Sequence, residues 1–133
     1  MDRVQFIVPW YVQEVSHRAT ELLLRVPRDA TDSQNYIAAC DLVVTKPGYS
    51  TVSEAILGRV PMLTYQREGF SEDDAIIDAV EDLGIGHRID SIQALKSLDL
   101  EAACAMRAAY DHLPDRYRRD GNLEAAERIL ELL

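Results

Sequence analysis

The stretch from Thr45 to Glu54 places a Pro-Gly turn directly before hydroxyl and carboxylate side chains. Pro47 cannot donate to a sheet ladder and Gly48 admits positive φ, so a strand is expected to end here and a helix to follow. The first N–H groups of a helix have no intrahelical partner, and the helix dipole favours an anion there. This turn therefore predicts a phosphate site.

A carboxylate follows closely on the predicted phosphate site. Glu54 comes three residues after Thr51, so a helix would carry both side chains on one face. Their acceptor lone pairs would suit the two hydroxyls of a ribose. A phosphate site beside a diol site indicates a nucleotide. Thr51-x-x-Glu54 also fits a capping box, which binds no ligand, and the sequence leaves both interpretations open.

A second group of polar residues, from Arg67 to Asp74, follows the next predicted strand. Ser71 fits an N-cap, and the acids after it would complement a helix dipole. A functional interpretation stays open beside this one. Glu72 could read sugar hydroxyls and Arg67 could meet a phosphate, because both would lie at the carboxyl ends of parallel strands, where open α/β sheets bind ligands.

The elements that must position these residues alternate along the chain. Apolar runs predict strands, and helical spacing between them, with Gly58 and Gly84 as stops, predicts helices. The predicted strands are Val4–Val8, Leu22–Val26, Leu42–Thr45, Val60–Tyr65 and Ile85–Ile89, and the chain is expected to be helical from Asp90 onward. Such alternation predicts right-handed βαβ units, and thus one Rossmann-like three-layer α/β domain over residues 1–133 with a parallel sheet between helices.

The amino-acid composition argues against several classes of function. The 133 residues carry a formal charge of −9, which argues against partners recognised through nucleic-acid phosphates or an acidic membrane surface. Cys40 and Cys104 match no metal or redox spacing and are expected to be reduced thiols. No apolar run is long enough to span a membrane and no leader is recognisable, so a cytoplasmic protein without a metal or cofactor is expected.

Four motifs in order resemble the C-terminal, donor-binding domain of GT-B glycosyltransferases of the family 28 type, which includes the murein-precursor N-acetylglucosaminyltransferase. They are DLVV at 41–44, KPGYSTVSEA at 46–55, GxxP at 58–61 and REGFxE at 67–72. The turn and the last motif resemble a subgroup that includes the glycosyltransferase-like region ahead of plant sugar kinases of the arabinose type. The resemblance extends from about Val4 to Leu133.

The resemblance implies a site for a UDP-sugar donor. Gly48, Ser50 and Thr51 would face the diphosphate, and Glu54 would hold the uridine ribose. The rim toward the donor sugar and phosphate would be formed by Arg67, Phe70, Glu72 and Asp73. Glutamate at position 72 stands where the murein enzyme has glutamine, which leaves the identity of the sugar open.

Two departures from the GT-B pattern matter for function. The acceptor, and usually the catalytic base, belong to an N-terminal domain, so no catalytic residue is assigned here. The chain also begins at what resembles the second strand of the donor domain, so Met1 is expected to mark a truncation or a chain that pairs with an acceptor subunit. We expect part of a hexosyltransferase that is inactive alone. The alternative is a non-catalytic nucleotide-sugar-binding or interaction module, and either could form a homo-oligomer through the sheet edge that the missing first strand leaves bare.

Overall fold

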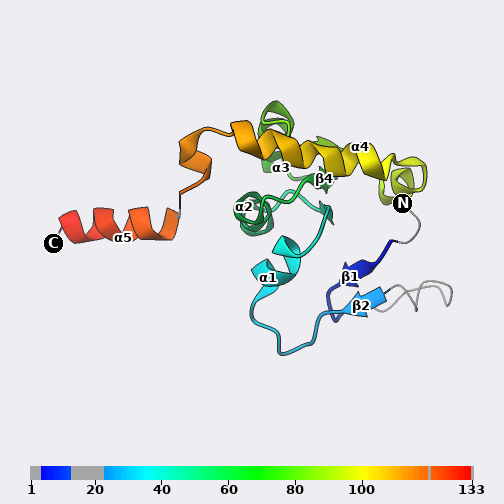
Figure 1. Cartoon of the computed structure of the whole chain (residues 1–133), viewed down its shortest axis with the longest axis horizontal. Helices are drawn as coiled ribbons and strands as arrows, with labels where there is room; N and C mark the ends of the chain where they lie inside the picture. Colours follow the sequence, from blue (N-terminus) through cyan, green and yellow to red (C-terminus); the bar gives the residue numbers. More distant parts are fainter. Residues whose placement is uncertain (1–3, 13–22, 120, 133) are drawn as a thin grey trace.

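The computed structural model describes residues 4–12, 23–119 and 121–132. Strands and helices alternate between residues 23 and 88, and the elements that follow are helices (Figure 1). The elements are β1 (Phe6–Val8), β2 (Leu23–Arg25), α1 (Ser33–Ala38), β3 (Val43–Thr45), α2 (Tyr49–Gly58), β4 (Met62–Thr64), α3 (Glu72–Asp82), β5 (Gly86–Arg88), η2 (Ile92–Ser97), α4 (Leu100–Ala105), η3 (Met106–His112), η4 (Asp115–Tyr117) and α5 (Gly121–Glu131).

The five strands form two parallel sheets. β1 pairs with β2, and β3, β4 and β5 form a second sheet with β4 in the middle. The mixed α/β class with parallel strands flanked by helices is confirmed, and each strand lies within its predicted run but is shorter. The expectation of one continuous sheet is wrong for the described residues, because β1 and β2 hydrogen-bond only with each other.

The core is built around β4. Residues 60–64 are all buried, as expected for a strand that is covered on both faces. The phenol of Tyr110, in η3, donates a hydrogen bond of 2.7 Å to the carbonyl of Val60 and fastens the C-terminal helices over the sheet. The buried members of the main cluster are Val52, Ala55, Met62, Ile76, Val80, Ile85, Tyr110 and Leu113.

Gly58 has a different role from the expected one. It is the last residue of α2, and Arg59 after it takes the left-handed conformation with φ of 57°. A Cβ at Gly58 would lie 3.1 Å from the Cα of Ala38 in α1. Glycine is therefore needed here because α1 and α2 approach each other closely, whereas Gly84, with φ of +68°, follows α3 as predicted.

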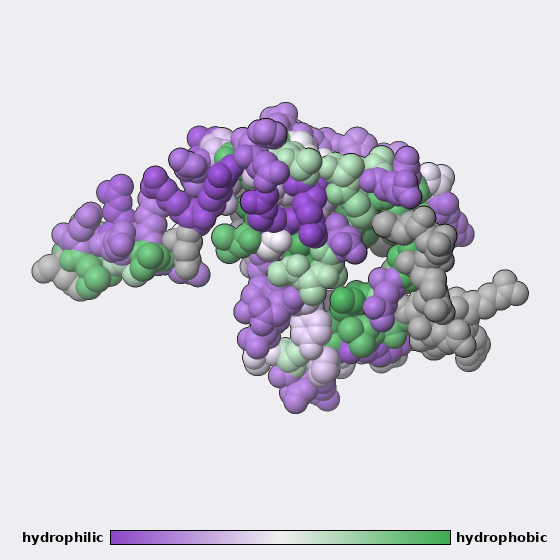
Figure 2. Space-filling model, in the orientation of Figure 1, coloured by the Kyte–Doolittle hydropathy of each residue, from purple (hydrophilic) through white to green (hydrophobic). Residues whose placement is uncertain are grey.

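The last helix, α5, projects away from the rest of the molecule (Figure 1). Its apolar residues gather on one side, which Figure 2 shows as a green strip below a purple one. Leu123, Ile129 and Leu130 are 60 to 70% exposed, and none of the α5 residues that the structure describes is buried. In the described parts of the chain, no helix has the length and apolar character that crossing a bilayer requires.

Candidate functional site

The carboxyl ends of β3 and β4 bring the two predicted groups of residues to one edge of the sheet. Thr45 and Thr64 are partners in register at these ends, so the turn at Lys46–Gly48 and the loop from Tyr65 to Ser71 leave the sheet side by side. α3 begins at Glu72, directly after this loop.

The N-terminus of α2 is open. Gly48 is its N-cap with φ of −94° and ψ of 135°, so the expected positive φ is wrong and any residue could adopt this backbone. A Cβ at Gly48 would meet no atom within 4 Å. No side chain among the described residues caps the helix. The N–H groups of the first turn can therefore donate hydrogen bonds to an anion. Ser50 is exposed and Thr51 is half-buried beside them.

The capping-box interpretation of Thr51 and Glu54 fails. Because α2 begins at Tyr49, Thr51 lies inside the first turn and does not occupy the N-cap. The carboxylate of Glu54 instead accepts a hydrogen bond of 3.4 Å from the hydroxyl of Ser33, the first residue of α1. Glu54 is half-buried, and its carboxylate is not used to cap the main chain of α2.

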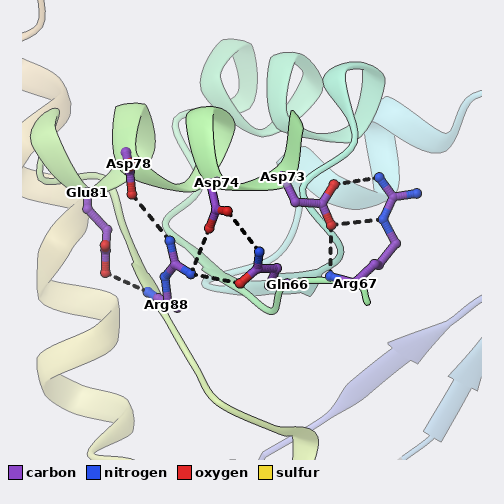
Figure 3. Close-up of polar contacts among 7 residues, drawn as sticks. All are labelled: Gln66, Arg67, Asp73, Asp74, Asp78, Glu81 and Arg88. Carbon is purple, nitrogen blue, oxygen red and sulfur yellow. Dashed lines mark hydrogen bonds and ion pairs between the residues drawn. The ribbon is translucent and has the colours of Figure 1, made fainter. Parts of the chain in front are cut away.

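Arg67 and Asp73 close the loop after β4 into a ring (Figure 3). One oxygen of Asp73 accepts from the backbone N–H and from Nε of Arg67, at 2.8 and 3.0 Å. The other oxygen lies 2.6 Å from the arginine Nη2. These hydrogen bonds hold the pKa of the Asp73 carboxyl below its usual value and raise that of Arg67.

The ring changes the roles expected for two residues. Asp73 has no exposed surface, so the structure places it under the loop as a structural acid rather than on the rim where it was predicted. The Arg67 side chain, 23% exposed, is already paired, which leaves it little freedom to meet a phosphate. Ser71 stands at the N-cap of α3 as predicted, but its side chain makes no capping hydrogen bond.

Phe70 and Glu72, which were predicted on the rim, are exposed at this edge of the sheet. The guanidinium of Arg67 stacks on the Phe70 ring at 3.8 Å from its centre, and Gly69 takes φ of +80° to turn the chain there. Phe70 remains 46% exposed. The Glu72 side chain is 63% exposed and lies 3.7 Å from Arg67. A ligand at this edge would therefore meet the Phe70 ring, which Arg67 holds in place, and the solvent-exposed carboxylate of Glu72.

A second arginine cluster was not predicted from the sequence. Arg88, at the end of β5, binds Asp74 at 3.1 Å and Asp78 at 3.2 Å, and its backbone N–H donates to Glu81 (Figure 3). Gln66 bridges Arg88 and Asp74. The signal was present, because acids at 74, 78 and 81 share one face of a helix. The cluster fixes α3 against the loop that carries Arg67.

Other titratable groups lie outside this edge. Cys40 and Cys104 are free thiols, and partial burial raises the pKa of both. His87 is exposed on β5, with its Nδ1 3.0 Å from Glu81. Within the described ranges, no three His, Cys, Asp or Glu side chains are arranged to hold a metal ion.

Known proteins resemble this chain in sequence. Over 113 residues it is 31% identical to an uncharacterized glycosyltransferase of Methanosarcina acetivorans, a match that covers 83% of this chain and 30% of that protein. No protein-family model matches the sequence.

Solved structures resemble it in fold. The glycotransferase of kitacinnamycin matches with a TM-score of 0.74 and 19% identity over 97% of this chain and 35% of that one. The glycosyltransferase SnogD from Streptomyces nogalater matches with a TM-score of 0.50 and 20% identity over 84% of this chain and 30% of that one. The fold is thus similar to that of GT-B glycosyltransferase domains, and this chain spans about a third of the length of these proteins.

Proposed function

We propose that this chain is the donor-binding part of a glycosyltransferase that uses a UDP-sugar, of the family 28 type. The observation that carries the proposal is the open start of α2 at the carboxyl edge of the sheet. Its N–H groups have no side-chain cap among the described residues, and Gly48 leaves room in front of them. The sequence match to a glycosyltransferase supports the same class of protein.

The proposed donor lies across this edge. Its diphosphate faces the first turn of α2, at Gly48, Ser50 and Thr51, where the helix dipole favours negative charge. Its ribose hydroxyls donate to Glu54. The donor sugar extends toward Phe70 and Glu72, whose exposed side chains offer an apolar face and a hydrogen-bond acceptor.

The chemical role of the site is to stabilise the leaving group. When the bond between sugar and phosphate breaks, negative charge grows on the β-phosphate oxygen of the departing UDP. Backbone N–H groups that are already oriented at the start of α2 stabilise this charge without reorganising. We propose no catalytic base among the residues of this site.

The acceptor is proposed to bind to a domain or subunit outside these 133 residues. The length comparison supports this proposal, since the chain covers only 30 to 35% of the glycosyltransferases that it resembles. The apolar side of α5 supports the proposal, because exposed apolar faces of this kind usually pack against another surface.

Thermal unfolding with UDP tests the donor site. A ligand that binds only the folded state adds RT ln(1 + [L]/Kd), which is about 1.4 kcal/mol at ten times Kd. For a domain of this size, that gain corresponds to roughly 5 °C in Tm. We expect UDP at millimolar concentration to raise Tm, and Glu54→Ala to abolish most of the rise.

The matched control is Glu68→Ala, which removes an exposed carboxylate from the loop after β4. This variant is expected to retain the UDP shift. An unchanged Tm in the wild-type chain with UDP would contradict nucleotide binding and favour an interaction module. If Glu54→Ala showed the full rise in Tm with UDP, Glu54 would not take part in UDP binding.

A further inference from the structure

The hydrogen bond between Ser33 and Glu54 joins two helices at the edge that carries the proposed donor site. Ser33 is the first residue of α1, and Glu54 lies in the second turn of α2. The serine Oγ donates to Oε2 of Glu54 at 3.4 Å. The two residues are 21 positions apart in the sequence, so this contact depends on how the helices pack.

The packing of α1 on α2 brings Ser33 to this place. At the far end of the pair, Gly58 allows the backbone of α2 to approach Ala38, where even a Cβ would lie 3.1 Å from the Ala38 Cα. Gly58 is one turn after Glu54, and Ala38 is the last residue of α1. The helices therefore run in the same direction, with the start of α1 beside the second turn of α2.

This contact has a chemical consequence for the carboxylate. A carboxylate offers about four lone-pair sites, and Ser33 uses one of them on Oε2. Oε1 and the remaining Oε2 site stay available to two further donors, which is the number that a ribose diol supplies. A glutamate side chain without a partner loses conformational entropy when it binds a ligand. A hydrogen bond from Ser33 that exists before binding reduces this entropy loss.

We propose that Ser33 is a positioning residue that orients the Glu54 carboxylate for the two ribose hydroxyls of the donor nucleotide. The inference rests on the proposed function and deepens it by adding a residue from α1, outside the motifs around α2. Ser33 acts through Glu54, so its loss is expected to weaken recognition of the ribose and to leave recognition of the diphosphate intact.

The test compares UDP with 2′-deoxy-UDP by isothermal titration calorimetry. The ratio of the two Kd values isolates the 2′-hydroxyl, because the base and phosphates are shared. In the wild-type chain UDP is expected to bind more tightly. In Ser33→Ala the affinity for UDP is expected to fall about three- to tenfold, as for the loss of one hydrogen bond, and the ratio is expected to approach one. Ser33→Thr, which keeps a hydroxyl, is expected to restore the ratio.

Ser53→Ala is the control, since Ser53 is exposed and adjacent to Glu54 on α2. It should leave both affinities unchanged. Ser33→Ala with an unaltered ratio overturns the positioning role while the proposed function stands. A wild-type chain that binds neither nucleotide overturns both proposals. A fall in affinity for both nucleotides by the same factor also overturns the positioning role, since it indicates a general disturbance of α1.

Discussion

At the scale of single residues, the Asp73 carboxylate illustrates how one buried charge can hold a loop. Three hydrogen-bond donors from Arg67 surround its two oxygens, and the side chain has no exposed surface. The loop after β4 is thus anchored to the first turn of α3 before any ligand arrives. Phe70 and Glu72, which lie on either side of Ser71, take their positions from this anchor.

The lowered pKa of Asp73 predicts how stability depends on pH. Since the folded-state pKa is depressed mainly by the hydrogen bonds from Arg67, the pair stabilises the fold fully above the unfolded value, near 4. This contribution is lost as the pH falls from there through the folded value. Denaturant titrations between pH 7 and pH 2 are expected to show this loss in the wild-type chain, and Asp73→Asn is expected to be less stable at pH 7 and to lack this part of the acid dependence.

Asp82→Asn is the appropriate comparison for Asp73→Asn, because Asp82 lies at the exposed end of the same helix. It should keep the wild-type acid dependence. If Asp73→Asn retained the whole of that dependence, the ion pair could not be its source.

At the scale of secondary-structure elements, the close packing of β4 against β5 depends on Gly86. A Cβ at this position would lie 2.5 Å from the carbonyl oxygen of Met62 and 2.8 Å from its Cγ. Both Gly86 and Met62 are buried, so neither strand can move without disturbing the core. Gly86→Ala is expected to lower the free energy of unfolding by about 1 to 3 kcal/mol through overpacking, measured by urea denaturation.

Gly121→Ala provides the control, because a Cβ at Gly121 would meet nothing within 4 Å. Its effect is expected to stay within about 0.5 kcal/mol, as for most surface substitutions. Equal losses in the two variants would argue against the close packing of β4 and β5 as the cause of the loss at Gly86.

The elements differ in how far the sequence reveals them. Apolar runs such as Val60–Thr64 located the strands because a strand covered on both faces needs continuous apolar residues. The start of α2 followed from Pro47 and Gly48. The partners of Glu54 and Asp73 could not be predicted, since Ser33 reaches Glu54 only through the packing of α1, and the burial of Asp73 depends on the closure of a loop. The separation of the strands into two sheets could not be predicted either, because which strands pair depends on how the whole chain packs.

At the scale of the whole molecule, α5 is the element that depends least on the rest. It has eleven residues, and none of those described is buried. Helices of this length are marginal in water without packing partners. In hydrogen exchange on this chain, amides of α5 are therefore expected to exchange orders of magnitude faster than those of α3, which carries four buried residues.

A partner that covers the apolar side of α5 would slow its exchange and leave α3 unchanged. Similar protection of α5 and α3 in the chain alone would instead show that α5 already packs against another surface, such as a second copy. Sedimentation at several concentrations would identify that case.

The hydrogen bond from Tyr110 to Val60 has a consequence for synthesis. The two residues are 50 positions apart, so β4 leaves the ribosome well before the phenol that closes the core over it. A nascent chain that ends between them exposes the apolar surface of Met62 and Val80 to other proteins. The edge that carries the proposed donor site is thus synthesised early, and its core is completed late, when the C-terminal helices are added.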